Sequence, residues 1–90
     1  MLLPRFIEHR KRDAVEIRDG LARGAFEDIA RIGHNMRGNG LSYGVAEIGA
    51  LGARLESAAH AKDAAEIGAA LVELEECIAG LSAGPAGEST

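Results

Sequence analysis

The chain has 90 residues, enough for one small domain with its own core and too few for two. Aromatic residues make up 3% and Trp is absent, so the core must be built from small and aliphatic side chains, and a cavity for a large cofactor is not expected. The formal net charge of −4 argues against a surface built mainly to neutralise nucleic-acid phosphates.

Several features bear on the compartment. No apolar run approaches the ~20 residues that a membrane span needs. The first twelve residues, MLLPRFIEHRKR, become charged at once, so we expect no secretory leader. Cys77 stands alone, which excludes a disulfide framework and a cysteine-based metal site within this chain and favours a reducing compartment. We therefore predict a cytoplasmic protein, with neither nucleic acid nor membrane among its partners.

Apolar residues recur at helical spacing in four segments. The first begins beside Pro4, which a first helical turn tolerates, and ends between Gly20 and Gly24. The second runs from about Ala25 and is predicted to stop at Asn39–Gly40, a pair suited to a left-handed cap.

The third segment runs from Val45 to Ala59 and ends near the polar sequence HAKD. The fourth begins at Asp63 with Glu66 three residues on, a capping-box arrangement, and its apolar repeat continues to Leu81. No segment alternates with period two and the connections are short, so the sequence predicts an all-α, up-down antiparallel four-helix bundle.

The last nine residues, SAGPAGEST, contain Gly, Pro and small polar residues with nothing to bury. We predict disorder after about Ser82, and the segment could equally be a linker to a further domain. Near the other end, a basic cluster is expected to be a solvated helix face rather than a nucleic-acid site. It consists of Arg5, His9, Arg10, Lys11 and Arg12.

The stretch GHNMRGNGLSYG, residues 33 to 44, carries a histidine and several glycines inside a helical pattern. On a helical wheel the apolar face centres between Ile29 and Gly33, so His34, Arg37 and Gly38 should face solvent together. An exposed imidazole is largely neutral near pH 7 and offers a lone pair, and a cation one turn away can bind an incoming phosphoryl oxygen.

Glycine at position 38 costs roughly 0.5–1 kcal/mol against alanine within a helix. A bare surface at Gly38 would let another macromolecule reach His34 closely. These residues resemble the signature of histidine-containing phosphotransfer (HPt) domains, in which a His is followed by Lys at +3, Gly at +4 and a second Gly at +10. The matching positions are His34, Arg37, Gly38 and Gly44.

The resemblance extends over almost the whole chain. ARIGHNMRGNGLSYGVAEIGALGARLESA looks like the family's stretch from the histidine helix into the next helix, including Leu55–Glu56. Two residues depart from the family pattern. Arg37 replaces the usual Lys but keeps the charge and can bind phosphate through two donors. Gly33 stands where Ala is common and is expected to permit close helix packing.

The resemblance implies an HPt-like bundle over residues 1–82, while composition predicts a disordered tail over residues 83–90. His34 would accept a phosphoryl group from a phospho-aspartyl receiver domain and pass it to another, Arg37 would stabilise its charge, and Gly38 would give the partner access. The implied partners are response-regulator receiver domains, with a hybrid sensor histidine kinase as a further candidate. Mg²⁺ would belong to the receiver, with no cofactor or metal bound by this chain.

We further expect a monomeric phosphohistidine carrier without ATP-dependent kinase activity of its own, because the glycine-rich stretch follows no strand and matches no nucleotide-binding motif. The rival interpretation is a docking or dimerisation module whose histidine is vestigial. His9 and His60 are expected to be solvated, and a zinc site is disfavoured because no two histidines are three or four residues apart. Cys77 is predicted to be a packing residue.

Overall fold

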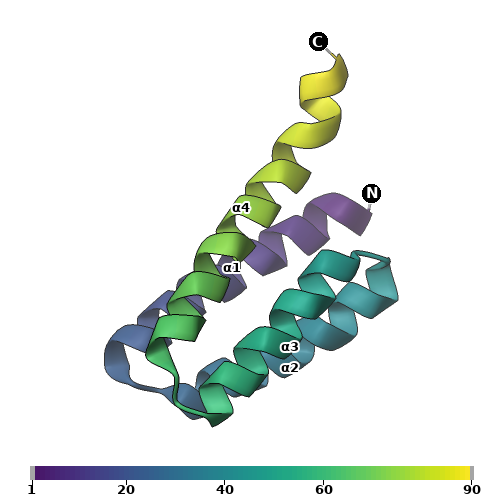
Figure 1. Ribbon diagram of the computed structural model, residues 1–90. Helices are drawn as coiled ribbons and strands as arrows, with labels where there is room; N and C mark the ends of the chain where they lie inside the picture. The colour runs from purple at the N-terminus through teal and green to yellow at the C-terminus, as the bar shows by residue number, and fades with distance from the viewer. Residues whose placement is uncertain (1, 90) are drawn as a thin grey trace.

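The computed structural model describes the backbone of residues 2–89 and the side chains of residues 4–82. Within this part the chain forms α1 (Leu2–Arg23), α2 (Phe26–Tyr43), α3 (Ala46–His60) and α4 (Ala64–Ser89), without strands. Consecutive helices pack side by side with reversed direction, and α4 returns against α1 (Figure 1). The prediction of an all-α, up-down antiparallel four-helix bundle is confirmed.

All four helices contribute to one apolar core. Its largest fully buried side chains come from aliphatic residues and one methionine, as the scarcity of aromatic residues predicts. Burying each such side chain contributes roughly 1.5–3 kcal/mol. These residues are Ile17, Ile29, Met36, Ile48, Leu55, Ile67 and Leu74. Cys77 packs against this core, in keeping with its predicted role.

Helices α2 and α3 form the most extensive contact of the bundle, and glycines allow it. A Cβ added to Gly33 would lie 2.7 Å from the carbonyl oxygen of Gly52, and one added to Gly52 would lie 2.6 Å from that of Gly33. Real Cβ atoms do not approach backbone so closely. Gly33 therefore permits close helix packing, as predicted, and Gly52 is equally required.

The predicted end of the second helix at Asn39–Gly40 is wrong. The helix continues to Tyr43 and ends at Gly44, which adopts the left-handed conformation with φ of 72°. Gly40 is buried, and a Cβ there would lie 2.7 Å from the Cα of Gly49. Gly40 is thus needed for close contact with α3 rather than for a cap, and the Asn39 amide bonds within the helix to the Asn35 carbonyl oxygen at 2.9 Å.

All three interhelical turns close with the same pair of backbone hydrogen bonds, a Schellman arrangement. The residue in the left-handed conformation bonds three residues back, and the next residue bonds five residues back. Gly24 and Gly44 hold this place in the first two turns, with φ of 71° and 72°. Lys62 holds it in the third, with φ of 54°, and is the one non-glycine residue at positive φ in the described chain.

Helix α4 begins after Asp63 as predicted, but only half of the capping box is present, because the Glu66 carboxylate accepts a hydrogen bond from Arg54 Nε at 3.0 Å. The Glu66 backbone N–H donates to the Asp63 carboxylate at 3.0 Å, so Asp63 caps the helix. The backbone of α4 runs on to Ser89, into the segment predicted as a disordered tail. The side chains of residues 83–90 lie outside the described part, so the domain boundary at residue 82 stays a prediction.

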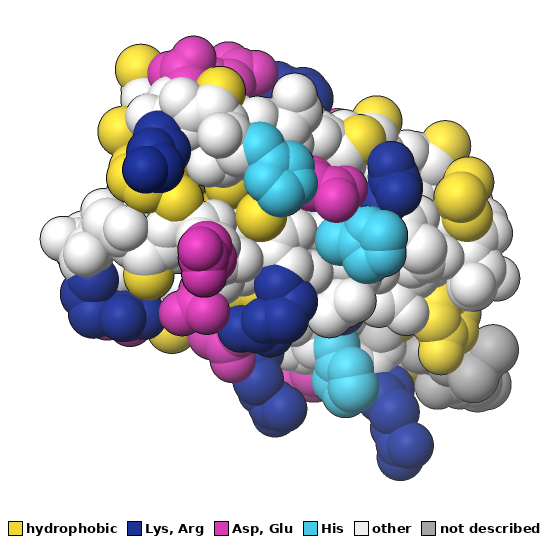
Figure 2. Space-filling view, turned by 90° about the horizontal axis from the view of Figure 1, so that it is seen from below, with side chains coloured by type: hydrophobic (Ala, Val, Ile, Leu, Met, Phe, Trp, Pro, Cys, Tyr) yellow, Lys and Arg dark blue, Asp and Glu magenta, His cyan; other side chains and the backbone are white. Residues whose placement is uncertain are grey.

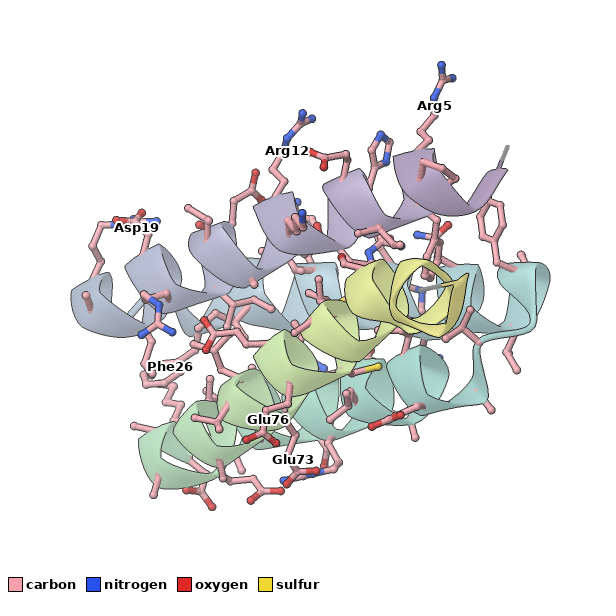
Figure 3. All side chains as sticks on the ribbon, turned by 90° about the horizontal axis from the view of Figure 1, so that it is seen from above. Arg5, Arg12, Asp19, Phe26, Glu73 and Glu76 are labelled. Carbon is pink, nitrogen blue, oxygen red and sulfur yellow. The ribbon has the colours of Figure 1, made fainter. Side chains whose placement is uncertain are left out.

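The basic cluster of α1 is only partly solvated. Arg5 and Arg12 point outward from the helix (Figure 3), whereas Arg10 is 5% exposed, so the prediction fails for Arg10. Its guanidinium carbon lies 5.0 Å from the centre of the Phe6 ring, and its Nε donates to Asp13 at 2.8 Å. Burial raises the pKa of Asp13 despite the attraction of Arg10.

Candidate functional site

His34 lies near the middle of α2, on the outer face of the helix. Ile29, Gly33 and Met36 point into the bundle, so the next residue after Gly33 is turned away from the core toward the side that borders α3. The His34 side chain is 60% exposed, as the wheel predicts. A ring so placed can meet a reacting group from solvent or from a second protein.

Glu56 of α3 is the first neighbour of this ring. Its Oε2 lies 3.2 Å from His34 Nδ1. A carboxylate can only accept a hydrogen bond, so the contact is satisfied when Nδ1 carries the ring proton. Nε2 is then the nitrogen with the free lone pair.

Arg37 borders the same carboxylate, one turn along α2. Its Nη1 lies 3.8 Å from Glu56 Oε1, longer than a hydrogen bond, and its side chain is 50% exposed. The pairing is therefore loose. Arg37 is therefore not tied to Glu56, and its role in stabilising phosphoryl charge stays a prediction.

Gly38 faces open space. A Cβ added there would find no non-local heavy atom within 4 Å, unlike one added to Gly33 or Gly40 on the same helix. Gly38 therefore has no packing role within the described structure. Because Gly38 has no side chain, nothing projects from the helix surface next to Arg37. The predicted access of a partner requires such a bare surface. Gly44, the last glycine of the motif, serves the backbone as the left-handed cap.

His60 lies closer to the site than its sequence position suggested. It is 70% exposed, as predicted, but its Nε2 lies 3.9 Å from Glu56 Oε2, so one carboxylate borders two imidazoles and a guanidinium. Sequence reasoning missed Glu56 as a site residue. The spacing of Glu56 and His60, four residues apart on one helix, was the available signal, but it does not reveal the distance to α2.

A hollow of about 470 Å³ opens beside His34, between α2 and the end of α3. Phe26, Ala30 and Ala59 form its apolar part, and the turn after α3 adds Lys62. Histidine side chains gather with acidic and basic side chains on this face of the molecule (Figure 2). Among the described residues, no group of three or more His, Cys, Asp or Glu is arranged to hold a metal ion.

The family model described as Hpt domain matches residues 1–84. The chain therefore belongs to the Hpt domain family, whose members take part in histidine phosphotransfer in phosphorelays and typically interact with receiver domains and kinases. No curated protein and no solved structure matches the chain. Within the described residues, no helix is both long and apolar enough to cross a membrane.

Proposed function

We propose that this chain carries phosphoryl groups on His34 between receiver domains. The observation that supports this function most directly is the contact of His34 Nδ1 with Glu56 in a ring that is otherwise open to solvent. An outward lone pair on Nε2 can attack a phosphoryl group in line. Gly38 adds no side chain to the surface one turn from this ring and faces open space, which leaves room for a second protein to bring that group.

In the forward step, the Nε2 lone pair forms a bond to the phosphorus of an aspartyl phosphate. The bond from phosphorus to the aspartyl oxygen breaks, and that oxygen keeps the electron pair as carboxylate. Nδ1 keeps its proton throughout, so no general base is needed. The ring gains positive charge as the N–P bond forms, and Glu56 stabilises that charge at 3.2 Å. The reverse step returns the phosphoryl group to a second receiver.

Arg37 would bind phosphoryl oxygens as they reach His34, since its guanidinium is only loosely held by Glu56. The expected transition state is loose, so positioning and charge contribute more than covalent activation. The partners would be response-regulator receiver domains, which would supply Mg²⁺ and the acidic pocket. A hybrid sensor kinase is a further candidate partner. We propose that this chain has no ATP-dependent activity of its own and that the exchange takes place in the cytoplasm.

The test is incubation with a phosphorylated receiver domain, followed by intact-mass measurement under non-acidic conditions that preserve phosphohistidine. We expect the mass of one phosphoryl group on the wild type and none on His34→Gln. The Gln variant should unfold at the wild-type temperature, because an exposed side chain adds little to the core. Labelling that persists in His34→Gln would contradict the site. A folded wild type that no receiver and no small phosphodonor labels would favour the docking module with a vestigial histidine.

A further inference from the structure

The turn between α3 and α4 differs from the other two turns in the residue at its left-handed position. All three have the same hydrogen bonds, and the first two place glycine at the left-handed position. The third places Lys62 there, with φ of 54°. In that conformation the Cβ of an L-residue crowds the following carbonyl oxygen, so glycine is the more stable choice. Lys62 therefore weakens a turn that glycine would strengthen.

No ion pair within the described residues offsets this strain. The Lys62 side chain is exposed and forms no ion pair with any described residue. Its backbone N–H bond to the Ala59 carbonyl oxygen, 3.0 Å, would be kept by any residue that is not proline. A strained residue whose side chain forms no ion pair within the described fold is a candidate for function.

Lys62 borders the same hollow as the proposed phosphotransfer residue, His34. Arg31 of α2 and His60 of α3 also line this hollow. Cationic or protonatable groups thus border the hollow on three elements of the structure. The acidic residues that line it are Glu27 and Glu56. A partner that covers His34 would also cover this hollow, because a standard protein interface buries about 800 Å² on each side.

We propose that Lys62 is a docking residue that binds a carboxylate of the receiver domain seated on His34. This inference rests on the proposed function, which supplies the partner and its acidic pocket. The ammonium lies at the rim of the contact and stays solvated, so it would attract and orient the acidic surface rather than act on the phosphoryl group. The strain of the left-handed lysine is then a stability loss retained for partner recognition.

The experiment compares Lys62→Gly with the wild type in three measurements. The melting temperature should rise by about 4–8 °C, since the strain is relieved in a domain of this size. Transfer from a phosphorylated receiver should slow by about fivefold at low salt, and the difference should shrink at high salt, where exposed charges are screened. Labelling of His34 by phosphoramidate, which needs no protein interface, should be unchanged.

Two further variants serve as controls. Lys62→Arg keeps the cation and should keep receiver transfer near the wild-type rate. Gly44→Lys places a lysine at the equivalent position of the α2–α3 turn, at the other end of the bundle (Figure 1), and is used for melting alone. Its melting temperature should fall, which calibrates the strain of a left-handed lysine in this arrangement.

A lower melting temperature for Lys62→Gly would overturn the proposal, because it would show that the lysine stabilises the fold. Undiminished receiver transfer would overturn it too. Loss of phosphoramidate labelling would place Lys62 in the chemistry instead of in docking. These outcomes leave the proposed function standing, provided that the wild type is labelled at His34. If neither donor labels the wild type, both the proposed function and the docking role of Lys62 are contradicted.

Discussion

The carboxylate of Glu56 on α3 lies 3.2 Å from Nδ1 of His34 on α2, across the most extensive helix contact of the bundle. The glycine contact between Gly33 and Gly52 sets this distance, because it brings the backbones together one residue before His34 and four before Glu56. Helix packing and the proposed choice of Nε2 as the reactive nitrogen are thus linked at one place.

Replacing Glu56 should slow phosphorylation without unfolding the domain. Glu56→Ala removes a charge-assisted hydrogen bond of ~1.5–3 kcal/mol, so labelling by phosphoramidate should fall by roughly tenfold to a hundredfold. Glu56→Gln keeps an acceptor oxygen for Nδ1–H but not the charge, and should be intermediate. Nitrogen NMR of the imidazole should show more Nε2–H tautomer in the Ala variant. Equal rates in all three proteins would mean that the contact does not orient the ring.

Arg37→Ala should slow transfer or shorten the lifetime of phosphohistidine while leaving the melting temperature nearly unchanged. The side chain is half exposed and contacts Glu56 only at 3.8 Å, so its loss removes little from the fold. One charge-assisted contact to phosphoryl corresponds to roughly tenfold to a hundredfold at most. Rates measured in both directions that match the wild type would reduce Arg37 to a solvated charge.

Two alanine substitutions on α2 should change stability in opposite directions. Gly33→Ala places a methyl group against the backbone of α3 and should lower the free energy of unfolding by about 1–3 kcal/mol. Gly38→Ala meets open space and should raise it by roughly 0.5–1 kcal/mol, because alanine is the better helix former. Urea denaturation of both variants checks the pair. Two changes of the same sign would contradict the packing described for one of these glycines.

Gly38→Leu separates access from stability. The melting temperature should not fall, since the added side chain faces water. Receiver transfer should collapse, because a leucine one turn from the imidazole holds the partner's phosphoryl beyond the ~3–3.5 Å that in-line attack needs. Labelling by phosphoramidate should survive. Receiver transfer at the wild-type rate would show that the bare surface at Gly38 is unnecessary.

Cys77 should be unreactive in the folded protein near neutral pH. Burial raises the pKa of its thiol to about 11, and Glu47 adds to the shift. At pH 8 the thiolate is then about a hundredfold scarcer than in a thiol of ordinary pKa, and alkylation by iodoacetamide should be slower by a similar factor than in urea. The native state favours the neutral thiol more than the unfolded chain does, so stability should fall as pH rises from about 9 to about 11. Fast alkylation at pH 7 would contradict this environment.

The sequence was sufficient for the helices and for the exposed position of His34, because both follow from the period of apolar residues along one helix. It was insufficient where two helices meet. Nothing in the pattern of α2 shows that Gly40 packs on α3 instead of capping the helix, and the approach of Glu56 to His34 depends on the same interhelical distance.

The position of Arg10 was predicted wrongly for a different reason. It lies four residues from both Phe6 and Ala14, on the core side of α1, so its spacing indicated burial while its charge argued for solvent. The Phe6 ring and the Asp13 carboxylate resolve the conflict, and neither contact could be assigned from residue type alone. The left-handed backbone of Lys62 was likewise out of reach, since lysine is a poor indicator of that conformation.

The close contact of α2 with α3 also decides which motions the site can tolerate. His34, Arg37 and Glu56 all belong to one helical hairpin, joined by the short turn at Gly44 and packed backbone to backbone. Helices α1 and α4 cover this hairpin through smaller interfaces, so local opening of the protein should begin with them. The imidazole and its carboxylate would remain in register through such opening. The domain could therefore flex at its other helices while a partner binds, without losing the arrangement proposed to receive the phosphoryl group.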